Sequence, residues 1–151
     1  QLMATKRFDP DDVLAFLNLL PKRQDGVPLQ HVIEPRHESF RTPEFVAMAR
    51  AAGVGIVFAE SDEHPCLADP SGPVAYARLQ RSREEEPLGY APAELDRWAE
   101  VAKAWARGEA PAGFPTCAPA VPAAPRDVYV FFIAGAKVRN PAAATALIER
   151  L

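Results

Sequence analysis

The sequence predicts an α/β fold that forms part of a (β/α)8 barrel, or TIM barrel, and three observations lead to this prediction. Helix-like and strand-like segments alternate in the order α-β-α-β-loop-β-α-β-α, which is typical of parallel strands covered by helices. The strand expected at residues 74–80 has a polar face that must point away from the helices, toward a barrel interior or a cleft. The chain has 151 residues, whereas a complete barrel needs ~250. We therefore expect residues 1–151 to be a single domain that supplies about four strand–helix units, or half a barrel.

Each predicted helix has a proline as its second residue, because proline suits the first turn of a helix. Apolar residues at helical spacing then give each helix one face to bury. Pro21, Gly53 and Gly108 end the first three helices. The expected helices cover residues 9–20, 42–52, 91–107 and 140–151.

Four strands are predicted between these helices, at residues 30–34, 54–59, 74–80 and 127–133. The segment 54–59 is apolar throughout, as in a strand that is buried on both faces. Residues 109–125 contain five prolines and many alanines, so we expect a low-complexity insertion without regular structure. Its composition predicts disorder, and its place between a helix and a strand puts it at the N-terminal ends of the strands.

Composition excludes some classes of function. The net charge of −3 argues against a broad electrostatic nucleic-acid interface. No apolar run approaches the ~20 residues of a membrane span, and no signal peptide opens the chain. Cys66 and Cys117 have no metal-binding spacing, so we expect free thiols and a cytoplasmic protein. Because the chain begins at Gln1, we expect it to be a fragment of a longer protein.

The first candidate site residues are Glu34, Arg36 and His37, which follow the strand at 30–34. Ligands of α/β proteins bind at the C-terminal ends of the strands, where this cluster should lie. A carboxylate beside a histidine suits acid–base catalysis, so we expect Glu34 or His37 to be the general acid or base. Arg36 is expected to bind substrate. The alternative is a salt bridge beside a surface histidine.

The polar face of the strand at 74–80 supplies Tyr76, Arg78 and Gln80, which we expect to bind substrate. A guanidinium group on an inward face must be paired or must bind a ligand, and its planar fork suits a carboxylate or a phosphate. The alternative for Arg78 is a structural ion pair with Glu34 or Glu60. Asn140 is either the cap of the last helix or, at the N-terminus of that helix, a further anion ligand.

No cofactor is required by these residues, although one metal-binding arrangement is conceivable. Three residues that follow the strand at 54–59 and two that follow the strand at 30–34 carry oxygen or nitrogen atoms that suit a divalent metal. These are Glu60, Asp62, His64, Glu34 and His37. No diagnostic metal-ligand spacing is present, so a solvated loop is the alternative. Cys66 has no adjacent base and is not interpreted as a nucleophile.

Four segments of the chain resemble the YecE-like family, also known as domain of unknown function 72, which has a TIM-barrel fold. The segment Glu34-Pro35-Arg36-His37-Glu38-Ser39-Phe40 is similar to the family's Glu-Phe-Arg-His-Pro-Ser-Trp, and Tyr76-Ala77-Arg78-Leu79-Gln80-Arg81 to its Tyr-Val-Arg-Leu-His-Gly. Residues 89–99 and 127–140 look like the family's next helix and its last strand–helix unit. The resemblance implies the C-terminal half of the barrel and no settled activity. Gln80 stands where the family usually has histidine, so a catalytic role of that histidine would be altered or lost here.

These observations together predict an enzyme that acts on a small anion bearing a phosphate or a carboxylate, with Arg78 as the anion clamp. Hydrolysis cannot be separated from lyase or isomerase chemistry by sequence. The alternatives are a non-catalytic binding module for an anionic metabolite or a nucleic-acid end, and a degenerate barrel remnant. Either the missing N-terminal half of the barrel or a second copy of the chain is the expected partner, since four strands leave two open edges.

Overall fold

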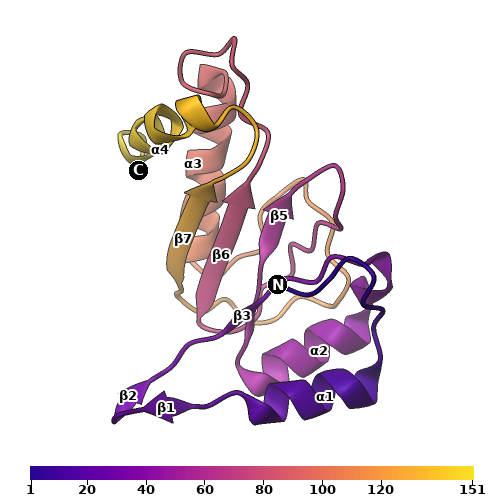
Figure 1. Cartoon of the computed structure of the whole chain (residues 1–151). Coiled ribbons are helices and arrows are strands. Elements are labelled where there is room, and N and C mark those ends of the chain that lie inside the picture. Colours follow the sequence, from indigo (N-terminus) through magenta and orange to yellow (C-terminus); the bar gives the residue numbers. More distant parts are fainter.

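The computed structural model describes all residues from 1 to 151, and short parallel strands form its central layer (Figure 1). Parallel pairing joins β3 (Val32–Ile33) to β4 (Gly55–Ile56), and joins β5 (Phe58–Glu60) to β6 (Val74–Leu79) and then to β7 (Asp127–Phe132). Strands β4 and β5 are separated only by Val57, whose N–H donates to the Ile33 carbonyl at 2.9 Å. Strands that follow one another in the chain are therefore neighbours in space. This is an α/β fold with parallel sheets and without a closed barrel.

Four helices lie close to their predicted positions: α1 (Pro10–Leu19), α2 (Pro43–Ala52), α3 (Pro92–Ala106) and α4 (Asn140–Ile148). The Asp9 carboxylate accepts a hydrogen bond from the Asp12 N–H at 3.1 Å, and the Thr42 hydroxyl accepts one from the Phe45 N–H at 3.2 Å. These side chains cap α1 and α2 at the starts that the sequence predicts for the two helices. Gly53 ends α2 at a φ of +66°, a conformation that favours glycine.

Two details of the strands differ from the prediction. The segment 54–59 is two strands rather than one, because pairing changes at Val57 from β3 to β6. A small antiparallel hairpin, β1 (Arg23–Gln24) with β2 (Val27–Pro28), also lies before β3 and was not predicted. Its turn is Asp25-Gly26, and both residues have positive φ, as two-residue hairpin turns require.

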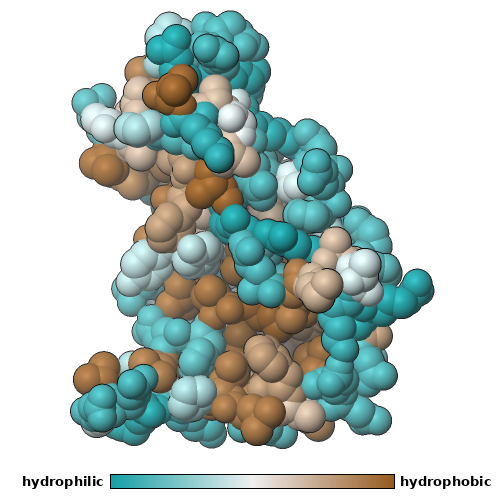
Figure 2. All heavy atoms as spheres, in the orientation of Figure 1, coloured by the Kyte–Doolittle hydropathy of each residue, from teal (hydrophilic) through white to brown (hydrophobic).

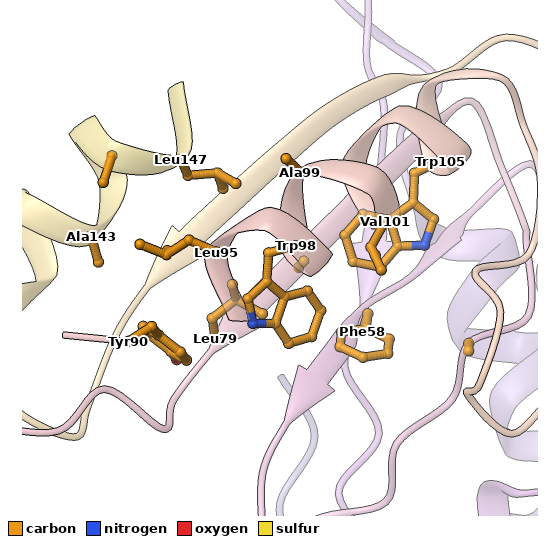
Figure 3. Packing of buried hydrophobic residues seen from close by; sticks show 13 residues of the cluster. Phe58, Leu79, Tyr90, Leu95, Trp98, Ala99, Val101, Trp105, Ala143 and Leu147 are labelled. Carbon is orange, nitrogen blue, oxygen red and sulfur yellow. The ribbon is translucent and has the colours of Figure 1, made fainter. Parts of the chain in front are cut away.

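Two hydrophobic clusters hold the helices to the strands. The larger lies between β5–β7 and the helices α3 and α4, and Figure 3 shows Trp98 and Trp105 of α3 packing beside Phe58. The smaller joins α1 and α2 to β3 and β4. Ala77 and Leu79 of β6 belong to the larger cluster, so the helices cover the apolar face of β6 as predicted. Its opposite face carries the polar candidates and is open.

Residues 109–125 contain no helix or strand, but their contacts correct the expectation of disorder. Phe114 stacks on Trp98, with 5.7 Å between the ring centroids, and meets Phe58 edge-on at 4.9 Å. The buried Asp69 carboxylate accepts hydrogen bonds from the N–H groups of Cys117 and Ala118, both at 2.8 Å. The bonds to Asp69 attach the segment to residues 61–73, which connect β5 to β6 without a helix. The Phe114 contacts attach it to β5 and α3. The contacts of Phe114 and of the buried Asp69 carboxylate therefore hold the segment in place despite its low-complexity composition.

Large apolar side chains remain exposed at the two ends of the row of strands. Leu14, Phe16 and Leu19 are exposed on α1, and Ile148 and Leu151 are exposed at the end of the chain. Tyr129 and Phe131 are exposed on β7, which is an edge strand. Figure 2 shows hydrophobic surface around α1 and along the side where β7 and α4 lie. No helix is long and apolar enough to cross a membrane.

Candidate functional site

The centre of the candidate site is Glu34, which follows β3 and is only 2% exposed. Arg78, on the open face of β6, donates from Nη1 to Glu34 Oε1 at 2.6 Å. Arg36, two residues after Glu34, donates from Nε to the same oxygen at 3.0 Å. The structure therefore brings together three of the predicted site residues, and it confirms the ion pair between Arg78 and Glu34 that sequence left as an alternative.

Both arginines keep N–H groups that no protein atom accepts. Arg78 contacts Glu34 only through Nη1, and Arg36 only through Nε. The side chains are 19% and 27% exposed, and none of their remaining N–H groups is buried without a partner. Two guanidinium groups thus surround one carboxylate, which leaves an excess positive charge and free N–H donors directed at solvent. Such donors suit a carboxylate or phosphate oxygen.

The surroundings of Glu34 favour its ionised form. Burial raises the pKa of this carboxyl, but hydrogen bonds from Arg78, Arg36 and Gln1 outweigh burial and hold the pKa below the ordinary value of 4.5. The Gln1 amide reaches Oε2 at 2.9 Å, so both carboxylate oxygens are engaged. An ionised carboxylate held in this way orients the two guanidinium groups and has no oxygen free for proton transfer.

His37 lies next to Arg36 and is held through one ring nitrogen. Its Nδ1 accepts from the Ser39 N–H at 3.1 Å and lies 2.8 Å from the Ser39 hydroxyl oxygen, which in turn accepts from the Phe8 N–H at 2.7 Å. An accepting Nδ1 places the proton of neutral histidine on Nε2. Nε2 has no protein partner and is not buried, so it is the nitrogen available to a ligand.

Aromatic rings flank Arg78 on the open face of the sheet. The Tyr76 ring stacks on Phe131 of β7, with 4.7 Å between centroids and 23° between planes. Phe131 is the register neighbour of Arg78 in the pairing of β6 with β7. Gln80 lies two residues beyond Arg78 on the same side of β6, and its buried Nε2 has no acceptor. Tyr76 and Gln80 thus lie on either side of Arg78 along the strand.

Asn140 has a different role from either of its predicted ones. It is the first residue of α4, and its side chain does not cap the helix. Its Oδ1 accepts from the Ser82 hydroxyl at 2.7 Å, and its Nδ2 donates to the Ala134 carbonyl at 3.2 Å. The amide therefore ties the loop after β6 to the loop after β7. It makes no contact with Glu34 or the two arginines.

A second carboxylate at the same end of the sheet, Glu60, was predicted as a metal ligand or as an alternative ion-pair partner of Arg78, which pairs with Glu34 instead. Its Oε2 accepts from the Tyr90 hydroxyl at 2.8 Å and from the N–H groups of Gln80 at 3.1 Å and Arg81 at 3.2 Å. The five proposed metal ligands do not converge, and the chain has no group of three acidic, histidine or cysteine side chains suited to a metal ion. No sequence signal links Glu60 to Tyr90, because the two residues are 30 positions apart.

Comparison with known proteins gives one match. The family described as "Protein of unknown function DUF72" matches residues 1–151. No curated protein and no solved structure matches the chain significantly.

Proposed function

Since the chain belongs to the DUF72 family, whose function is unknown, we propose a function from the site alone: the protein binds a small anion through Arg78 and Arg36 and acts on it enzymatically. The anion carries a phosphate or a carboxylate group. Its oxygens take the N–H donors that Glu34 leaves free on the two guanidinium groups. His37, which follows Arg36 in the chain and has an unpartnered Nε2, supplies the acid or base.

The observation that carries this proposal is the sharing of one buried carboxylate by two arginines. Glu34 binds both Arg78 and Arg36, so the cluster carries one positive charge in excess and keeps free guanidinium N–H groups. The carboxylate fixes the direction of each guanidinium plane, so a bound anion meets donors that are already oriented. Glu34 was expected to exchange protons, and in this proposal it positions the arginines instead.

Phosphate dependence of thermal unfolding tests the proposal. Inorganic phosphate should raise the melting temperature of the wild type at a fixed protein concentration, because binding to the folded state stabilises it. Arg78→Lys keeps the charge but loses the planar fork, so it should reduce the phosphate response by more than half. Arg107→Lys makes the same replacement at an exposed arginine that pairs with Glu109 and should respond like the wild type. Equal phosphate responses in the wild type and in Arg78→Lys would end the proposal.

A further inference from the structure

Glu60 combines one fixed and one free carboxylate oxygen at the C-terminal end of β5. Three donors hold Oε2: the Tyr90 hydroxyl and the N–H groups of Gln80 and Arg81. Oε1 accepts no hydrogen bond, and it is not among the buried polar atoms that lack a partner, so it reaches solvent. The side chain is thus rigidly held while one oxygen stays available to a ligand.

The free oxygen belongs to a shallow hollow at the mouth of the sheet. Its lining consists of Glu60, Ser61, Asp62, Glu63, Gln80, Arg81 and Ala134. Gln80 connects this hollow to the arginine site, because it lies two residues beyond Arg78 on the same face of β6, about 7 Å along the strand. Its Nε2 is buried and has no acceptor in the protein. The residue shared by the hollow and the polar face that carries Arg78 is therefore Gln80.

The groups around Glu60 keep its proton exchangeable. Burial raises the pKa of this carboxyl, and the hydrogen bonds from Tyr90, Arg81 and Gln80 only partly offset the rise. The one nearby cation, Arg81, is itself paired with Asp62. Tyr90 stays protonated because burial and Glu60 raise its pKa, and burial raises the pKa of the Cys66 thiol to about 11. Neither Tyr90 nor Cys66 therefore adds a negative charge beside Glu60.

We propose that Glu60 is a second proton-transferring group of this site, besides His37, and that it acts on a hydroxyl or carbonyl oxygen of the bound anion. This inference rests on anion binding at Arg78 and Arg36. The protonated carboxyl gives the proton on Oε1 to the ligand oxygen. The carboxylate that remains is held by the Tyr90 hydroxyl and the two backbone N–H groups. In the reverse step the carboxylate takes the proton back, so no other reactant is needed.

Two probes that differ by one hydroxyl test where the ligand reaches. Butane-1-sulfonate and 4-hydroxybutane-1-sulfonate share an anion that does not titrate, so calorimetric binding compares only the terminal hydroxyl. The hydroxylated probe should bind the wild type about fivefold more tightly, as expected for one added hydrogen bond. Glu60→Ala should remove this preference. Glu63→Ala is the control, because it removes a carboxylate from the same hollow but leaves Glu60 and its hydrogen bonds in place. This variant should keep the preference for the hydroxylated probe.

Carboxyl carbon NMR of the ligand-free protein tests the proton itself and does not depend on Glu60→Ala folding. The resonance missing in Glu60→Gln should titrate above the ordinary value of 4.5. Tyr90→Phe should raise this midpoint further, because the hydroxyl favours the carboxylate form. A purely structural Glu60 would not produce a hydroxyl preference.

Each outcome decides between the two proposals. Equal binding of the two sulfonates, or an ordinary or lowered titration midpoint, overturns the role of Glu60 and leaves anion binding intact. Failure of both sulfonates to bind removes anion binding at the arginines and the role of Glu60 with it.

Discussion

At the scale of single residues, Glu34 and Glu60 show how two glutamate side chains in one protein have their pKa values shifted in opposite directions. Glu34 lies between two guanidinium groups and an amide, which hold its pKa down. Glu60 receives only neutral donors and is desolvated, so its pKa is raised. Divergent pKa values of two carboxyl groups are a general sign of divided roles within one site. Here they separate a group that orients cations from a group that exchanges a proton.

We predict that Glu34→Gln lowers the free energy of unfolding by about 1–3 kcal/mol at pH 7, because it leaves Arg78 and Arg36 without their counter-ion. Since the folded-state pKa of Glu34 is lowered, its stabilisation is present above 4.5 and is lost as the pH falls through the folded-state value. The difference between wild type and variant should therefore shrink in acid. Urea unfolding at a series of pH values measures it.

Glu38→Gln is the matched control for this prediction, since Glu38 forms only an exposed pair with Arg41. It should change the urea midpoint little at any pH. A Glu34→Gln variant as stable as the wild type at pH 7 would show that Glu34 does not hold the two arginines.

At the scale of elements, residues 109–125 cover part of the larger hydrophobic cluster beside α3. Phe114 packs against both Phe58 and Trp98, and the Arg97 guanidinium group lies over its ring, 4.8 Å from the centroid. The segment therefore stabilises α3 against the strands without regular structure of its own. Its contacts are on the helix-covered side of the sheet, away from Arg78.

We predict that Phe114→Ala lowers the free energy of unfolding by about 2–3 kcal/mol, because it opens a cavity beside the two aromatic rings. The phosphate-induced rise in melting temperature should stay that of the wild type, since Arg78 lies on the opposite face. Val121→Ala, in an exposed part of the same segment, serves as the control and should change stability little. A phosphate response that disappears in Phe114→Ala while the protein stays folded would place the segment at the site.

The elements could be predicted from the sequence where neighbouring residues determine them. Prediction failed where the structure depends on contacts between residues that are far apart in the chain. Asp9 and Thr42 mark the starts of α1 and α2 because a cap acts within one turn. The hairpin at Asp25-Gly26 was missed although an Asp-Gly pair with flanking strand residues is a known turn signal. The alternation of polar and apolar residues alone predicted the polar face of β6 and placed Arg78 on it. Neither the break at Val57 nor the link from Glu60 to Tyr90 has any local signature, since both depend on which strands and loops meet.

At the scale of the whole molecule, the row of parallel strands is open at both ends. β7 is an edge strand with Tyr129 and Phe131 exposed on one face, and the residues at the chain's end leave Ile148 and Leu151 uncovered. Open strand edges with apolar neighbours are templates for pairing with another chain.

We predict that these 151 residues self-associate in a concentration-dependent manner. Light scattering after size-exclusion chromatography, over a range of loading concentrations, measures the mass distribution. Tyr129→Lys places a charge on the edge strand and should shift the distribution toward the monomer. A monodisperse monomer at every concentration, with a sharp cooperative melt, would contradict this prediction.

The central claim is that Arg36 and Arg78 form one anion site around Glu34. Diffraction from crystals soaked in selenate tests it most directly, because the anomalous scattering of selenium distinguishes the anion from water in a difference map. We expect a peak within hydrogen-bonding distance of free guanidinium nitrogens of both Arg36 and Arg78, and no such peak in crystals of Arg78→Lys. A map with no peak at these two arginines, or with selenate only at other basic side chains, would contradict it.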